Sequence, residues 1–254
     1  MTSTSSSSFV GNSLASVEQI EAVLNTNTRA IQRYAANITQ LTGVYLHLPQ
    51  AVIATAIVYL QRYIVNNPNT DQNKIDRLHS SALLLSSTIN DISISDTAIA
   101  RVGKYVSDRP ELVYDNQLIT QAEYPPEINF ERLSSIREGC TDLLKCIGFD
   151  TVVQLPHTFA LSYAQILGLH QGTDSRYFLQ LWALMNDAVR VCPLLLLLHQ
   201  PPTIAVATML IAAGDLEIII SEQDWWEVFD VRQDDLKHCV DMIAEGIESE
   251  KKTK

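Results

Sequence analysis

Two helix-length apolar runs, one in each half of the chain, constrain the fold more than any other feature of the sequence. One is Ser80-Ser-Ala-Leu-Leu-Leu-Ser-Ser87 and the other is Ile204-Ala-Val-Ala-Thr-Met-Leu-Ile-Ala-Ala213. In both runs small residues alternate with large apolar ones, and small side chains allow helix backbones to approach closely. Residues 80–92 and 206–218 also share the order small, large apolar, small, acidic, apolar. We therefore expect a duplicated all-α fold, each half built around one buried central helix.

The length and composition suit two helical domains. At 254 residues the chain can form two domains of roughly 100–150 residues each. Apolar residues make up 46% of the chain, enough for two cores, and 9 glycines are few for a β-rich protein. The net charge of −11 argues against nucleic acid or an anionic membrane as the main partner.

The N-terminal segment and the apolar segment over residues 191–213 carry no targeting or membrane signal. Residues 1–8 are rich in Ser and Thr, without the basic start and apolar core of a signal peptide. We expect residues 1–25 to form a mobile leader followed by a short helix. Pro193, Pro201 and Pro202 divide residues 191–213 into pieces too short to cross a membrane. We interpret these pieces as two buried core segments joined by a Pro-Pro turn.

The four cysteines are scattered without any C-x-x-C spacing, at Cys140, Cys146, Cys192 and Cys239. Reduced thiols in an intracellular protein are the favoured interpretation, and disulfides or a zinc site are the alternatives.

Apolar residues recur at helical spacing through both halves of the chain. In the first unit, residues 26–150, the pattern predicts helices over 28–42, 49–66, 75–88, 97–106 and 130–147. Asp96 is the predicted N-cap of the fourth of these helices. In the second unit, residues 151–248, it predicts helices over 158–169, 175–191, 203–213 and 234–248, with a short turn at 224–229. Residues 249–254 are expected to be a tail.

No sequence pattern of an enzyme active site is present. The chain lacks a Gly-rich phosphate loop, H-E-x-x-H, G-x-S-x-G and a kinase catalytic signature. His157 could act as a catalytic base, but a histidine that starts a helix and bonds to backbone is much more common. Trp225 and Trp226 could form a ligand platform, although two bulky aromatic residues after a buried helix more often cap a core. We therefore expect no catalytic residue, no metal site and no cofactor.

Several segments resemble the cyclins, and they follow one another in the family's order. Leu46-His-Leu-Pro-Gln-Ala-Val-Ile-Ala-Thr-Ala-Ile-Val-Tyr-Leu-Gln-Arg-Tyr63 is similar to the second helix of the first cyclin box in cyclin L. Leu143-Leu-Lys-Cys-Ile-Gly-Phe149 resembles the L-K-x-L-x-F that ends the fifth helix, and Leu155-Pro156-His157 resembles the H-P-H entry to the second box. Asp224-Trp-Trp-Glu-Val-Phe229 resembles the W-W-x-x-F turn of the transcription-associated group around cyclins L, K, T and Q. The resemblance covers roughly residues 28–248.

The resemblance implies two tandem five-helix cyclin boxes and a non-catalytic subunit that binds and activates a cyclin-dependent kinase. In cyclins the kinase-contacting surface comes from the third and fifth helices of the first box. It implies a partner-binding site at Thr88, Ile89, Asp91, Cys140, Leu144 and Phe149. The family's K-x-E-E reads Thr88-Ile-Asn-Asp91 here, and the glutamate that pairs with the lysine falls on Cys140. This chain thus lacks both the lysine and the glutamate of the family's pair. It keeps apolar residues at the contact positions Ile89, Leu144 and Phe149.

Two hypotheses about function follow from this departure. In the first, the protein is a divergent cyclin that still activates its own kinase through an apolar surface. Replacing a buried ion pair by a well-packed apolar contact changes the interaction free energy little, so binding can persist. In the second, it is a cyclin-fold scaffold that binds other proteins and activates no kinase. The resemblance also implies a nuclear protein that acts in transcription or RNA processing, with no direct contact to nucleic acid or membrane.

Overall fold

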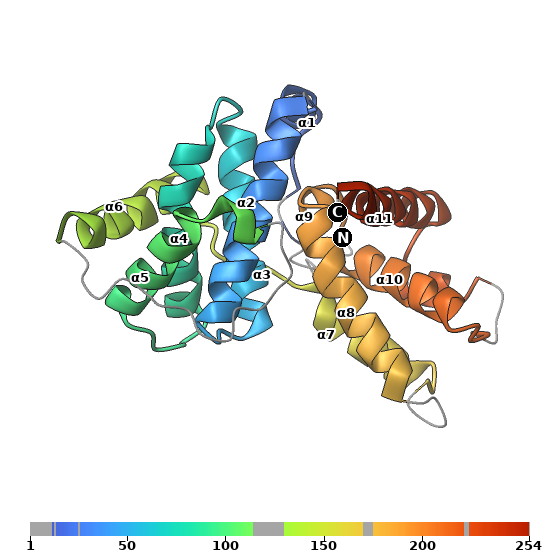
Figure 1. Cartoon of the computed structure of the whole chain (residues 1–254). Helices are drawn as coiled ribbons and strands as arrows, with labels where there is room; N and C mark the ends of the chain where they lie inside the picture. Colours follow the sequence, from blue (N-terminus) through green and yellow to red (C-terminus); the bar gives the residue numbers. More distant parts are fainter. Residues whose placement is uncertain are drawn as a thin grey trace, which may run out of the picture.

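The structure, a computed structural model, describes residues 12, 14–24, 26–113, 130–169, 175–220 and 224–253. In these segments it contains eleven α-helices, two short 3₁₀ helices and no β-strand (Figure 1). The predicted all-α fold is confirmed. Most of the expected leader, residues 1–11, lies outside the described residues.

The helices follow one another with mostly short connections. In chain order they are α1 (Val17–Val23), α2 (Thr26–Tyr45), α3 (Gln50–Asn66), α4 (Gln72–Ile89), α5 (Asp96–Ser107), η1 (Pro110–Val113), α6 (Phe130–Cys146), α7 (Pro156–Ile166), α8 (Ser175–Val191), α9 (Leu195–Leu198), α10 (Pro201–Asp215), η2 (Trp225–Phe229) and α11 (Gln233–Thr253).

The predicted helices coincide with the observed ones, and the differences lie at their ends. The predicted N-cap of α5 is wrong: the helix begins at Asp96 itself, and its N-cap is Ser95. The Ser95 hydroxyl is hydrogen-bonded to that of Thr97 at 2.6 Å and caps no backbone N–H. At the other end of the chain, α11 continues to Thr253 through most of the expected tail. The short helix α9 was not predicted, because a run of leucines has no helical period.

α4 is a buried central helix of the first half, as its small residues predict. Its Ser80 faces Gly103 of α5, and its Ser81 faces Gly139 of α6. A Cβ atom on either glycine would come closer than 3.0 Å to the facing serine hydroxyl. The small residues on the three helices therefore allow a close approach on two sides of α4.

α10 is the corresponding buried helix of the second half. All residues from Thr203 to Met209 are buried, as the second apolar run predicts. Pro201 and Pro202 form the first turn of α10 and are not a separate turn, because proline lacks only an N–H that the first turn leaves unbonded anyway. Within the described segments, no helix is both long and apolar enough to span a membrane.

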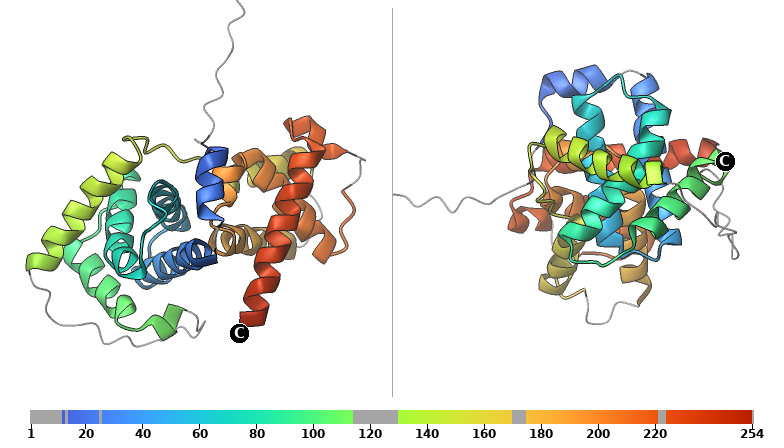
Figure 2. Two further views of the ribbon diagram at one scale, coloured as in Figure 1. Left: turned by 90° about the horizontal axis from the view of Figure 1, so that it is seen from above. Right: turned by 90° about the vertical axis from the view of Figure 1, so that its left-hand side faces the viewer.

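The described residues form two large hydrophobic cores, to both of which α3 contributes, and a small third cluster of Val23, Val65, Leu194 and Leu197. One core contains residues from α2 to α6, such as Tyr59 and Leu83, and the other contains residues from α7 to α11, such as Tyr177. Ile53 and Ile57 of α3 belong to the second core. Figures 1 and 2 show α3 between the two groups of helices. The boundary near residue 150 stays a prediction.

The N-terminal segment also joins the two halves, through Asn12. The Asn12 side chain exchanges two hydrogen bonds with the backbone of Gln154, of 2.8 and 2.9 Å. Its backbone exchanges two more, both of 3.1 Å, with the side chain of Gln200 before α10. A little further on, the Ala15 N–H donates to the Leu197 carbonyl of α9 at 2.9 Å. This segment therefore holds α9 and the connection before α7 in place.

Candidate functional site

Three of the predicted partner-binding residues lie together at the C-terminal end of α4. Thr88 is exposed, and its hydroxyl donates to the Leu84 carbonyl of its own helix at 2.9 Å. Ile89 is 39% exposed although it is the last residue of a central helix. Asp91 follows with a left-handed backbone, φ 55°, and its N–H donates to the Thr88 carbonyl. The end of α4 therefore presents an apolar side chain beside polar ones.

Cys140 and Leu144 lie on α6, where α6 packs against α4, and both are half-buried. The Cys140 thiol donates to the Ser81 carbonyl at 3.3 Å. Burial, and secondly the charge of Asp96, raise the pKa of this thiol to about 11, so it is neutral at physiological pH. Leu144 packs against the first core. These two residues help to hold α6 on α4, which limits their availability to a partner.

Phe149 lies away from the end of α4. It follows α6 with a left-handed backbone, φ 59°, and its N–H donates to the Leu144 carbonyl at 2.9 Å. The same end of α6 lies beside the end of α3, where the Asn66 side chain donates to the Cys146 carbonyl at 3.4 Å. The Phe149 ring is 69% exposed. The six predicted residues therefore form two exposed groups, one after α4 and one after α6, joined by a half-buried stretch of α6.

An exposed ion pair near the end of α4 was not predicted. Arg137 of α6 donates from Nε (3.0 Å) and from a terminal nitrogen (2.7 Å) to one carboxylate oxygen of Asp96 at the start of α5. Arg137 precedes Cys140 by about one helical turn, and Asp96 is close enough to act on the Cys140 thiol. No spacing rule signals the pair, because its members are 41 residues apart.

The candidates for chemistry in the second half are part of its packing. His157 is buried and bonds to the Asn186 side chain at 2.8 Å, so the expected bond to backbone is wrong. Burial lowers the pKa of His157, and its ring lies edge-on to Trp182. Within the described part of the chain, no group of three or more His, Cys, Asp or Glu side chains is placed to hold a metal ion.

The tryptophan pair caps the second core, as the commoner of the two interpretations predicts. Trp225 is 4% exposed, belongs to the second core and contacts Phe229 edge-on. Phe229 in turn stacks on Tyr163 of α7, with ring centroids 3.8 Å apart.

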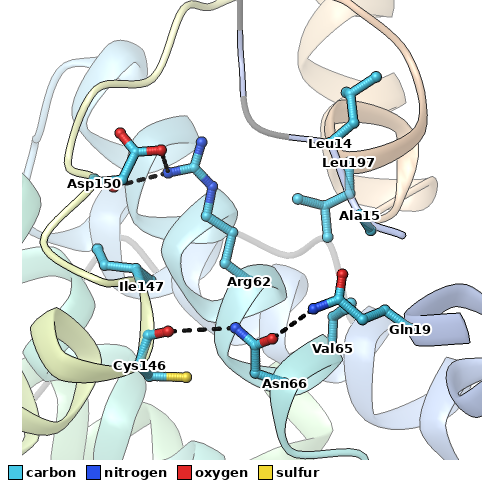
Figure 3. Close-up of a pocket in the computed structure, with 10 residues that line it drawn as sticks. All are labelled: Leu14, Ala15, Gln19, Arg62, Val65, Asn66, Cys146, Ile147, Asp150 and Leu197. Atoms are coloured by element: carbon cyan, nitrogen blue, oxygen red, sulfur yellow. Dashed lines mark hydrogen bonds and ion pairs between the residues drawn. The ribbon is translucent and has the colours of Figure 1, made fainter. Parts of the chain in front are cut away.

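A pocket of about 220 Å³ lies where α1, α3, α9 and the chain after α6 meet (Figure 3). Arg62 of α3 extends along it and donates to the Asp150 carbonyl at 2.9 Å, with the Asp150 carboxylate at 3.7 Å. Across the pocket, Gln19 donates to the Asn66 side chain at 2.7 Å. The pocket is lined by none of the six predicted residues. Its polar side chains bond to one another or to nearby carbonyls within residues 19–152, and the backbone bond from Ala15 to Leu197 connects the pocket wall to the second half.

Comparisons with solved structures define the class of fold. A chain of the yeast RNA Pol II CTD kinase CTDK-1 complex superposes with a TM-score of 0.69 and 18% identity, covering 93% of this chain and 73% of that one. A viral cyclin from herpesvirus saimiri superposes with a TM-score of 0.60 and 13% identity, over 88% of this chain and 86% of that one. The protein therefore has the cyclin fold.

Within that class, the sequence is similar to cyclins of the L group. It is 25% identical to an uncharacterised cyclin-L1-like protein of Schizosaccharomyces pombe, over 91% of this chain and 88% of the relative. It is 24% identical to cyclin-L1-1 of Oryza sativa subsp. japonica over 85% of this chain, and 26% identical to cyclin-L1 of Danio rerio over 80%. The chain spans 48% of the rice relative and 39% of the zebrafish one. No family model matches the chain.

Proposed function

We propose that this protein is a non-catalytic regulatory subunit that binds and activates a cyclin-dependent kinase in the nucleus, in transcription or RNA processing. The observation that carries the proposal is its similarity to L-type cyclins over most of its length. The cyclin fold, shared with a chain of an RNA Pol II CTD kinase complex, supports it.

The binding surface in this proposal extends from the end of α4 along α6 to Phe149. Ile89 and Phe149 are exposed apolar side chains in a protein with a net charge of −11, and such residues are the usual anchors of an interface. Thr88 and Cys140 carry no charge, so the kinase is held here without the family's Lys–Glu pair. To activate the kinase, the bound subunit must move the regulatory helix of the kinase inward. This movement aligns a second Lys–Glu ion pair, which belongs to the kinase and holds the phosphates of ATP.

The alternative is a cyclin-fold scaffold, and the same loss of charge favours it. A surface with Thr88 and Cys140 in place of Lys and Glu can bind a kinase without moving its regulatory helix. The two proposals agree on the fold. In the scaffold proposal the chain binds other proteins, and a kinase that binds to it gains no activity.

A panel experiment tests the proposal. Each recombinant cyclin-dependent kinase of the source organism is purified alone and mixed with this chain. Affinity is measured by calorimetry, and phosphorylation of an RNA polymerase II C-terminal-domain peptide is measured with and without the chain. We expect one kinase to bind and to gain activity at least tenfold. Binding without a gain in activity would refute the activating subunit and favour the scaffold. No binding to any kinase would refute the activating subunit and its proposed kinase surface, and would leave a scaffold that binds other proteins.

A further inference from the structure

Two exposed ion pairs of the described chain, Arg137–Asp96 and Lys74–Asp142, join different helices, and the second lies near the start of α4 and the end of α6. The Lys104–Asp108 and Arg232–Asp235 pairs each lie within one short stretch of chain, four or three residues apart. Arg137 and Asp96 instead join α6 to the start of α5 across 41 residues. Stability does not explain such a pair, because an exposed ion pair contributes little to the free energy of folding.

The geometry of the pair leaves groups available for a partner. Both donating nitrogens of Arg137 bind the same oxygen of Asp96, Oδ2. Among the described residues, the other carboxylate oxygen of Asp96 and the remaining N–H groups of Arg137 make no further hydrogen bond. The Arg137 side chain is 69% exposed and the Asp96 side chain 30%. A hydrogen-bond donor and an acceptor thus lie side by side, which is the pattern that pairs with an exposed peptide group.

Because Asp142 pairs with Lys74 while Cys140 contacts Ser81, α6 runs antiparallel to α4, and Arg137 therefore lies further towards the Ile89 end of α4 than Cys140 does. Arg137 and Cys140 lie on neighbouring turns of α6. Asp96 begins the helix that follows the exposed end of α4. An apolar side chain flanked by an exposed arginine is a common arrangement of an interface, since arginine is enriched there and lysine is depleted.

We infer that Arg137 contacts the kinase directly, by donating to a main-chain carbonyl of the kinase segment that covers Ile89, and that Asp96 is the positioning residue that fixes the guanidinium. In this chain an arginine–aspartate pair between α5 and α6 thus supplies the polar contact next to the apolar one. The inference rests on the proposed function, because it concerns the same interface.

The test is a double-mutant cycle of binding, measured by calorimetry with the kinase that the panel identifies. The variants are Arg137→Ala, Asp96→Asn and the two combined. The matched control is Lys104→Ala with Asp108→Asn, an exposed pair of similar distance, 2.7 Å, on α5. We expect each single change to lower affinity at least tenfold and the combined change to lower it no further than Arg137→Ala, because Asp96 acts through Arg137. The control stays within twofold, and thermal unfolding midpoints stay unchanged for all variants.

The measured affinities distinguish a failure of the proposed function from a failure of this inference. If the unchanged chain binds no kinase, the proposed function fails and this inference fails with it. If the chain binds but Arg137→Ala stays within twofold, only this inference fails. Additive losses would overturn the positioning role of Asp96, since each residue would then bind the kinase independently.

Discussion

At the scale of single residues, Phe149 combines an exposed ring with an unfavourable backbone. A left-handed φ of 59° suits glycine, and a bulky residue in that region carries strain on the order of 1 kcal/mol or more. The exposed ring recovers little of this cost by packing, since 69% of the residue faces solvent. A strained, exposed aromatic residue is better explained by binding than by stability.

Phe149→Gly separates these two effects. The change relieves the strain, so the free energy of unfolding in urea should stay equal or rise by up to about 1 kcal/mol. Kinase affinity should fall at least tenfold, because the ring is an anchor of the proposed surface. Glu217→Gly is the matched control: Glu217 is exposed, follows α10 and has φ 55°, so stability should respond similarly and affinity should not change. Unchanged affinity in Phe149→Gly would remove Phe149 from the surface.

At the scale of helices, the fold depends on close crossings at α4. Gly139 of α6 meets Ser81 and Leu78 of α4, and a Cβ atom there would also lie 3.0 Å from the Ser81 Cβ, which no side-chain rotation relieves. Gly214, near the end of α10, has no such neighbour within 4 Å. The two glycines therefore differ in packing although both are helical.

The pair Gly139→Ala and Gly214→Ala tests these crossings. Overpacking costs about 1–3 kcal/mol and exceeds the gain in helix propensity of up to about 1 kcal/mol, so Gly139→Ala should destabilise the protein. Gly214→Ala should have no effect or stabilise by up to about 1 kcal/mol. Urea denaturation measures both. Equal effects of the two changes would show that α6 does not approach α4 closely.

The helices could be predicted from the sequence, and the small residues of α4 indicated its central place. Contacts between distant residues could not be predicted. The Arg137–Asp96 pair, the bond from His157 to Asn186 and the Asn12 contacts all depend on how the helices are arranged in space. The split of the predicted site has the same cause. The resemblance places six residues in one site, but the burial of each residue depends on how α6 crosses α4. Cys140 and Leu144 are half-buried at this crossing and pack against the first half of the chain.

At the scale of the whole molecule, stability depends on histidines that stay neutral in the cores. Burial, and secondly the nearby Arg132, lower the pKa of fully buried His79 to about 4, and burial also lowers the pKa of His157 and His199. An unfolded histidine has a pKa of about 6.5. Between these values the unfolded chain takes up a proton that the folded protein does not. The contribution to stability is therefore complete above about pH 6.5 and is lost as the pH falls towards 4.

Urea denaturation at pH 7, 6 and 5 tests this dependence. The unfolding free energy of the unchanged protein should fall with pH, by up to about 1.4 kcal/mol per pH unit from His79 alone. His79→Gln should remove that part of the slope, whatever its effect on stability at pH 7. His47→Gln is the control, because His47 is exposed. If His79→Gln keeps the full slope, His79 is not the group that titrates.

In the proposed function, the end of α4, in the first half of the chain, holds the kinase. The most direct measurement compares the kinase affinity of Ile89→Asp with that of Leu179→Asp, since Leu179 of α8 is an exposed apolar residue in the second half, 70% exposed. A carboxylate placed in the interface without a partner costs about 3 kcal/mol or more, so Ile89→Asp should weaken binding roughly a hundredfold. Leu179→Asp should bind as the unchanged chain does, and both variants should keep their helical circular dichroism. Unchanged affinity in Ile89→Asp, or a greater loss in Leu179→Asp, would contradict the claim.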